Sequence, residues 1–194
     1  MGALPELSTR RLKLRRWRTE DREPFAALNA DPAVMEFFAT PLSRGESDSL
    51  IDRIESGFER NGFGLWAVEV RATAEFIGFA GLEVPEFDAH FTPTVEVGWR
   101  LARNAWGNGY ATEAGRRALA FGFEELSLGE VVSFTAVANT RSRAVMEGLG
   151  MVRDTGEDFD HPALSEGDPL RRHVLYRISP VADGRSQGAT FFGR

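Results

Sequence analysis

The stretch WGNGYATEA, residues 106–114, places two glycines one residue apart, after an apolar run and before a segment with helical spacing. Glycine costs about 0.5–1 kcal/mol relative to alanine inside regular structure, so the pair needs a physical reason. One reason is a tight turn. Another is the close approach of backbone N–H groups to a phosphate, which a helix N-terminus favours through its unpaired amides and partial positive charge. The stretch therefore predicts either a structural turn or an anion-binding loop.

Two common phosphate-binding patterns do not match this pair. A Walker A loop needs Lys and Ser or Thr after its last glycine, whereas Gly109 is followed by Tyr110. A dinucleotide fingerprint needs Gly or Ala three positions after its second glycine, where this chain has Thr112. A Rossmann oxidoreductase is therefore disfavoured.

Composition and charge bound the class of protein. The chain has 194 residues, 42% of them hydrophobic, and a net charge of -6, which predicts one globular domain, disfavours nucleic acid as a partner and mildly favours a cationic one. Without cysteine it has no disulfides, thiolate metal sites or cysteine nucleophiles. Because no long apolar run occurs, we expect no membrane segment and a cytoplasmic location. We also expect no metal, because His161, near Asp158 and Asp160, fits a loop hydrogen bond better than a set of metal ligands.

Hydrophobic spacing and capping residues predict an α/β chain. The expected strands are residues 11–17, 63–71, 76–84, 94–101, 130–137, 151–156 and 173–178, and the expected helices are residues 19–30, 43–61, 110–126 and 140–149. The basic residues of RLKLRRW, 11–17, are expected to face outward and blunt an edge strand. Gly98, inside a strand, predicts a bulge or a close backbone approach, and Asn139 predicts a helix N-cap.

This order of elements around the glycine loop is similar to that of the GCN5-related N-acetyltransferase (GNAT) superfamily. The acetyl-CoA loop of that family reads Gln/Arg-x-x-Gly-x-Gly/Ala, and residues 106–111 match it except that Trp106 stands in the Gln/Arg place. The form W-G-x-G-Y-A-x-E-A, with NTRS at 139–142 and EGLGM at 147–151, resembles the RimJ/RimL-like branch. The resemblance covers residues 8–179, and residues 180–194 are expected to form a polar C-terminal tail. It implies a mixed, mostly antiparallel central sheet of about six to seven strands, splayed at strand four and flanked by about four helices.

The resemblance implies acetyl-CoA as co-substrate and also implies where it binds. Backbone groups of Trp99, Arg100 and Leu101 would pair with the pantetheine arm, beside a bulge at Gly98 that opens the sheet. Asn139 would bond the same arm, or serve only as a cap. The pyrophosphate would be held by the backbone of six consecutive residues: Gly107, Asn108, Gly109, Tyr110, Ala111 and Thr112.

The implied reaction is direct transfer of the acetyl group, in a ternary complex, to a primary amine of a protein N-terminus or small molecule. The amine must lose a proton, and Glu96 is the first candidate base because its strand leads to the thioester; Glu83 and Asp158 are alternatives, as is a purely structural role for Glu96. Many relatives protonate the leaving thiolate with a Tyr, whose place here holds Met146. Ser142 resembles the alternative donor of the RimJ/RimL-like branch, or is a plain helix serine.

A non-catalytic acyl-CoA-binding sensor or scaffold is the alternative function, because Met146 has no proton to give. Segments 37–46, 85–92 and 158–170 would select the acceptor, with Phe38, Trp66, Phe87 and Phe91 as candidate pocket residues. The resemblance also allows a homodimer.

Overall fold

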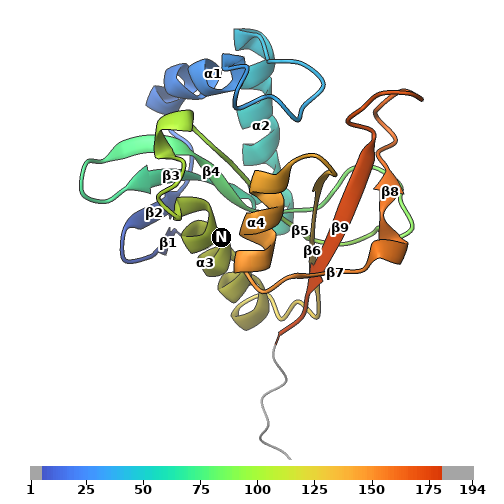
Figure 1. Ribbon diagram of the computed structural model, residues 1–194. Helices are drawn as coiled ribbons and strands as arrows, with labels where there is room; N and C mark the ends of the chain where they lie inside the picture. The colour runs from blue at the N-terminus through green and yellow to red at the C-terminus, as the bar shows by residue number, and fades with distance from the viewer. Residues whose placement is uncertain (1–5, 181–194) are drawn as a thin grey trace, which may run out of the picture.

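The computed structural model describes residues 6–180, so the predicted polar tail lies outside the described residues except for its first position. Within them, nine strands form one sheet in the order β1-β2-β3-β4-β5-β6-β9-β7, with β8 paired to β9 (Figure 1). The strands are β1 (Leu7–Ser8), β2 (Leu12–Arg15), β3 (Leu65–Val70), β4 (Glu75–Glu83), β5 (Glu96–Leu101), β6 (Val131–Ala136), β7 (Val152–Arg153), β8 (Phe159–Asp160) and β9 (Arg172–Ile178). All neighbours are antiparallel except β5 and β6. The sheet is therefore mixed and mostly antiparallel, as predicted; the two-residue strands β1 and β8 are the additional ones.

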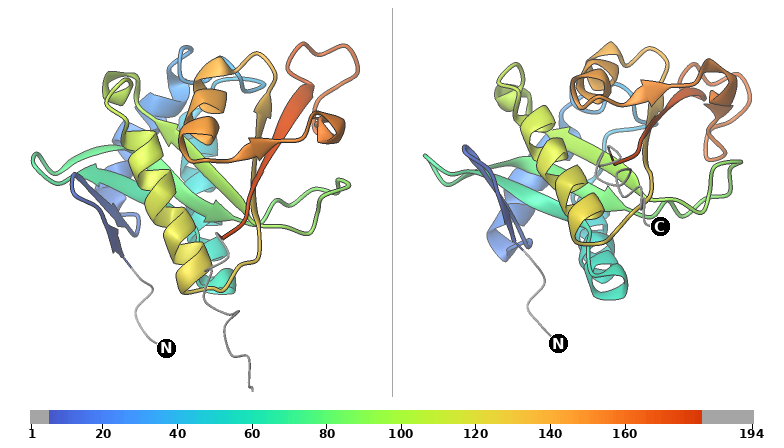
Figure 2. Two further views of the ribbon diagram at one scale, coloured as in Figure 1. Left: turned by 60° about the horizontal axis from the view of Figure 1, so that its bottom comes forward. Right: turned by 90° about the horizontal axis from the view of Figure 1, so that it is seen from below.

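Helices cover both faces of this sheet. They are α1 (Arg22–Ala30), α2 (Arg44–Asn61), α3 (Tyr110–Glu124) and α4 (Thr140–Gly148). Figure 2 shows α1 and α2 on one face and α3 on the opposite one. Ser43 and Glu46 form a capping box that begins α2, and Gly62, with φ 76°, ends it. Within residues 6–180, none of the helices has both the length and the apolar character that crossing a membrane requires.

The core lies between the helices and the sheet and is rich in aromatic rings. Trp66 on β3 has no exposed surface, and its ring centroid lies 5.3 Å from that of Phe58 on α2 and 5.5 Å from that of Phe121 on α3. Full burial of such a side chain contributes roughly 1.5–3 kcal/mol. Trp66 therefore belongs to the core rather than to the wall of an acceptor pocket.

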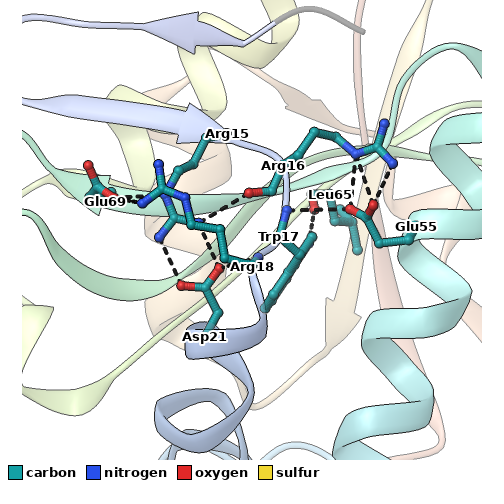
Figure 3. A network of polar contacts seen from close by, with 8 residues as sticks. All are labelled: Arg15, Arg16, Trp17, Arg18, Asp21, Glu55, Leu65 and Glu69. Atoms are coloured by element: carbon teal, nitrogen blue, oxygen red, sulfur yellow. Dashed lines mark hydrogen bonds and ion pairs between the residues drawn. The ribbon is translucent and has the colours of Figure 1, made fainter. Parts of the chain in front are cut away.

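A buried ion-pair network joins the start of α1 to the sheet (Figure 3). Arg15 on β2 is 2% exposed, and its Nη1 and Nη2 donate to the two carboxylate oxygens of Asp21 at 2.6 and 2.8 Å. Its Nε donates to Glu69 on β3 at 2.7 Å. The prediction that the basic run blunts an outer edge is therefore wrong for Arg15. Strand β1 pairs with β2, and the guanidinium lies inside the protein, where its partners offset the cost of desolvation.

The sheet opens between β5 and β6, where the resemblance implied a splayed strand four. That strand is β5 in the structure, because the additional strand β1 precedes the others. The two strands share a single register pair, Glu96 with Val132. On its other side β5 stays paired with β4 in regular register, with Gly98 opposite Gly81. The bulge expected at Gly98 is therefore wrong, and the opening arises because β6 diverges from a regular β5.

Candidate functional site

The glycine loop connects β5 to α3 and turns sharply at both glycines. Gly107 and Gly109 adopt left-handed φ angles of 76° and 74°, which residues with a side chain rarely take. Between them, the Asn108 amide nitrogen lies 3.2 Å from each of two loop carbonyl oxygens, those of residues 105 and 106. The Asn108 side chain therefore holds the loop in shape, and only its backbone is available to a ligand.

The loop presents the N-terminus of α3 with unpaired amides. Gly109 is the N-cap, and the first helical bond runs from Glu113 N to Gly109 O at 3.0 Å. Within residues 6–180, no hydrogen bond occupies the backbone N–H of Tyr110, Ala111 or Thr112. Such free amides, together with about half a positive charge at the helix end, form a site that suits an anion.

Arg11 lies beside this helix end, although it is far away in sequence and no local pattern indicated it. Its guanidinium sits 4.7 Å from the Tyr110 ring centroid, and its Nε donates to Glu113 at 2.6 Å. Its Nη2 is 3.6 Å from the position that a Cβ on Gly109 would take. Burial would raise the pKa of Glu113, but hydrogen bonds from Thr9 and Arg11 outweigh it and lower that pKa. Glu113 therefore holds the guanidinium of Arg11 next to the glycine loop.

The edge of β5 that faces the opening offers free backbone groups. Ala102 N donates to Ile77 O at 2.8 Å, which marks these two residues as a hydrogen-bonded pair that continues the pairing of β4 and β5. Along an antiparallel strand, residues point their backbone N–H and C=O groups alternately toward one neighbour and the other. The backbone groups of Arg100 therefore point toward β4, and those of Trp99 and Leu101 point toward the gap. The Leu101 carbonyl already accepts a bond from the indole of the glycine-loop tryptophan at 2.9 Å. Trp99 thus has both backbone groups facing the opening, whereas Arg100, expected to share this role, does not.

Helix α4 begins near the same opening. The side-chain oxygen Oδ1 of Asn139 accepts from Ser142 N at 3.1 Å, and its side-chain nitrogen Nδ2 donates to Thr135 Oγ1 at 2.9 Å. Asn139 is therefore the predicted cap, with one amide hydrogen left over for a ligand. Ser142 is half-buried in the first turn of α4, and no hydrogen bond within the described residues involves its hydroxyl. Met146, one turn further on, is fully buried.

A cavity of about 300 Å³, which we call the α2 pocket, lies between α2 and the sheet. Its helix wall consists of residues at helical spacing: Leu50, Arg53, Ile54, Gly57, Arg60 and Asn61. The sheet and the loop after β4 form the opposite wall, which includes Leu65, Leu82, Glu83, Phe87 and Glu96. A wider hollow of about 670 Å³ between α1 and the segment after β5 holds none of the candidate catalytic residues. The α2 pocket therefore brings two of the three candidate bases together.

Glu83 and Glu96 lie opposite each other at the end of the β4–β5 hairpin. Burial raises the pKa of Glu96 well above its ordinary value, and the nearby charge of Glu83 raises it further. Asp158, the third candidate base, is instead ion-paired with Arg153. A carboxylate whose pKa is raised by burial holds a proton more strongly and is suited to accept one in a reaction, so Glu96 fits that role better than the ion-paired Asp158.

Comparison with known proteins agrees with this geometry. Residues 11–152 match the family model of the acetyltransferase (GNAT) domain. Over 177 residues the chain is 34% identical to FsC-acetyl coenzyme A-N(2)-transacetylase of Aspergillus fumigatus, covering 86% of this chain and 74% of that one. Over 152 residues it is 33% identical to YkkB, an uncharacterized protein of Bacillus subtilis, covering 78% of this chain and 87% of that one.

A solved structure is similar to this chain over nearly its whole fold. The acetyltransferase of Agrobacterium tumefaciens is similar with a TM-score of 0.73 and 26% identity, covering 92% of this chain and 96% of that one. The family match spans most of the chain and includes the glycine loop, the open edge of β5 and the start of α4. The chain therefore belongs to the GNAT acetyltransferase family and is an acetyl-CoA-dependent acyltransferase.

Proposed function

We propose that this enzyme transfers the acetyl group of acetyl-CoA to a primary amine by direct attack within a ternary complex. The observation that carries the donor half of the proposal is the row of free backbone amides at residues 107–112, on a loop with two left-handed glycines. These amides and Arg11 would hold the pyrophosphate. The pantetheine arm would lie along the open edge of β5, bonded by Trp99, by the Leu101 N–H and by the remaining amide hydrogen of Asn139.

The acceptor amine would occupy the α2 pocket, with Glu96 as the proton acceptor. The amine nitrogen forms a bond to the thioester carbonyl carbon, while the Trp99 N–H stabilises the negative charge that develops on the carbonyl oxygen. Glu96 takes the proton that the nitrogen loses. The C–S bond then breaks, and the CoA thiolate leaves with a proton from Ser142, whose hydroxyl is restored from solvent. Holding both reactants together supplies much of the rate.

The name of the Aspergillus relative supports this reaction class, since it describes acetyl transfer from acetyl coenzyme A to a nitrogen. We also propose that residues 8–179 form the catalytic domain and that the motif WGNGYATEA places it in the RimJ/RimL-like branch. The choice between a protein N-terminus and a small molecule, the cytoplasmic location and the homodimer stay predictions.

Calorimetry with acetyl-CoA tests the donor site. The wild type should bind, and Gly109→Trp should not, because a large side chain at φ 74° would displace the loop and meet Arg11. Gly129→Trp is the matched control, since Gly129 lies beyond the other end of α3 with nothing within 4 Å of its Cβ position. Binding that survives in Gly109→Trp would contradict the assignment of the loop.

Release of CoA thiol tests the transfer itself. We would supply acetyl-CoA with benzylamine, spermidine or a tripeptide with a free N-terminus and record initial rates. Turnover with any of them excludes the non-catalytic binding module. Binding of acetyl-CoA without turnover on a broad amine panel would favour that module instead.

A further inference from the structure

The α2 pocket ends in two carboxylates that lie directly across from each other. Glu83 on β4 and Glu96 on β5 are register partners, and the next pair on the same side of the hairpin is Gly81 with Gly98. A Cβ on Gly98 would lie 3.6 Å from Glu83 Oε1 and 3.9 Å from Glu96 Oε1. The two carboxylates therefore border the same small space, which the glycine leaves open.

Neither carboxylate has a cationic side chain as a direct partner within the described residues. Among residues 6–180, no hydrogen bond or ion pair involves the side chain of Glu83 or Glu96. Arg100, two residues from Gly98 on β5, is drawn away toward α1: its Nη1 donates to Asn29 at 2.7 Å, and its guanidinium lies 4.1 Å from the Phe38 ring centroid. Like charges opposite each other in a sheet destabilise it, so this arrangement costs stability unless a proton or a ligand cation resides there.

The charged groups around the pair come from three other places. Arg53 and Arg60 line the same pocket from α2, and Arg60 is ion-paired with Glu86 of the loop after β4. Arg100 lies on β5 with its guanidinium turned toward Asn29, but its charge still acts on Glu83. Burial raises the pKa of Glu83, which the charges of Arg100 and Arg53 oppose and the charge of Glu86 supports. Burial also lowers the pKa of Arg100 to about 10, which keeps it a cation at neutral pH. Burial thus acts on both carboxyls and the charge of Glu83 acts on Glu96, whereas Arg100 and Arg53 moderate the effect on Glu83 alone.

We propose that Glu83 and Glu96 act as one coupled carboxyl pair that is doubly ionised before the reaction and shares the single proton it takes from the amine, with Glu83 as the positioning residue that sets how strongly Glu96 takes up that proton. The inference rests on the proposed function, since it concerns how that reaction loses its proton. When the amine nitrogen bonds to the thioester carbon, its proton passes to the doubly ionised pair, which becomes singly protonated. The thiolate departs as the C–S bond breaks, and the pair later returns its proton to solvent.

The pH dependence of catalysis distinguishes a coupled pair from two independent glutamates. We would measure kcat/KM for benzylamine against pH in wild type, Glu83→Gln, Glu96→Gln and Glu75→Gln. The rising limb of the pH profile that reports ionisation of the enzyme, rather than of the amine, should move to lower pH by about one unit in Glu83→Gln. The reason is that Glu96 no longer ionises beside a like charge. In Glu96→Gln the rate should fall about 100-fold or more. Glu75, exposed at the other end of β4, is the matched control and should leave the limb in place.

Urea denaturation gives a second readout that needs no acceptor. Both carboxyls have pKa values raised above the ordinary 4.5, so the folded state binds more protons than the unfolded state above that pH. The free energy of unfolding should therefore fall as pH rises above about 4.5, until the pair is fully ionised. The slope should flatten in Glu83→Gln and in Glu96→Gln but not in Glu75→Gln.

The two readouts separate failure of the pair from failure of the proposed function. If Glu83→Gln changes neither the limb nor the denaturation slope, the proposal is overturned even where benzylamine is acetylated. If benzylamine and the other amines are not acetylated but both glutamine variants flatten the slope, the coupling is supported and the assigned reaction fails.

Discussion

Gly57 offers a direct test of where the acceptor binds, because one substitution there should raise stability and lower activity. It lies in the middle of α2 on the wall of the α2 pocket, and no atom is within 4 Å of a Cβ built on it. Gly57→Leu removes a glycine from a helix interior, which should raise the free energy of unfolding by about 0.8 kcal/mol. In a chain of this size that corresponds to a Tm higher by about 2–3 °C.

The same leucine should interfere with the acceptor. Its side chain would enter a cavity of about 300 Å³, and crowding a packed site costs about 1–3 kcal/mol. The KM for the amine should therefore rise by about 5- to 150-fold. The affinity for acetyl-CoA should stay the same, because α2 and α3 cover opposite faces of the sheet (Figure 2).

Scanning calorimetry and initial rates of CoA thiol release with benzylamine would measure both effects. Gly45→Leu is the matched control: Gly45 is also in α2 with nothing within 4 Å of its Cβ position, but it is exposed and outside the pocket. That variant should keep the wild-type KM. A stabilised Gly57→Leu with an unchanged KM would refute the reasoning, because the amine would then bind elsewhere.

Three other substitutions test the network, the loop and the proton donor. Asp21→Ala should lower the free energy of unfolding by about 3 kcal/mol, because it removes the bidentate partner of buried Arg15; a loss under about 1 kcal/mol in urea denaturation would show that the pair adds little. Gly109→Ala forces a Cβ into a left-handed conformation at φ 74° that costs about 1–2 kcal/mol, so calorimetry should find acetyl-CoA bound about 5- to 30-fold more weakly; an unchanged Kd would contradict this. Ser142→Ala should lower kcat about 100-fold with the same Kd for acetyl-CoA, whereas Thr140→Ala in the same helical turn should not; equal kcat values in the two variants would exclude Ser142 as the acid.

Features that depend on a few neighbouring residues could be predicted from the sequence. The turn at Gly107 and Gly109 follows from the residue type, since only glycine takes those φ angles readily. The cap at Asn139 is also confirmed, because its partner is only three residues away. Hydrophobic spacing and capping residues predicted the order of the main strands and helices, and the family resemblance added the mixed, mostly antiparallel sheet; the structure confirms both.

Features that join distant segments could not be predicted. The basic run at residues 11–17 has the charge of an exposed strand, and only the pairing of β2 with β3 shows that Arg15 meets Glu69 in the interior. Glu83 and Glu96 were both named as candidate bases, but their direct opposition is set by the register of a long hairpin. In the sequence, Gly57 is only a residue of weak helix propensity. Its place in the α2 pocket depends on the sheet residues across from it, which are distant in sequence.

The proposed donor site of this enzyme consists mostly of main-chain groups, whereas the proposed acceptor site consists mostly of side chains. The glycine loop and the open edge of β5 offer main-chain groups, which every residue type except proline retains in full while the fold persists. The α2 pocket offers side chains, each of which a single codon change replaces. Proteins that share this fold should therefore retain binding of the donor with the backbone, whereas their acceptor specificity can diverge through side-chain substitutions.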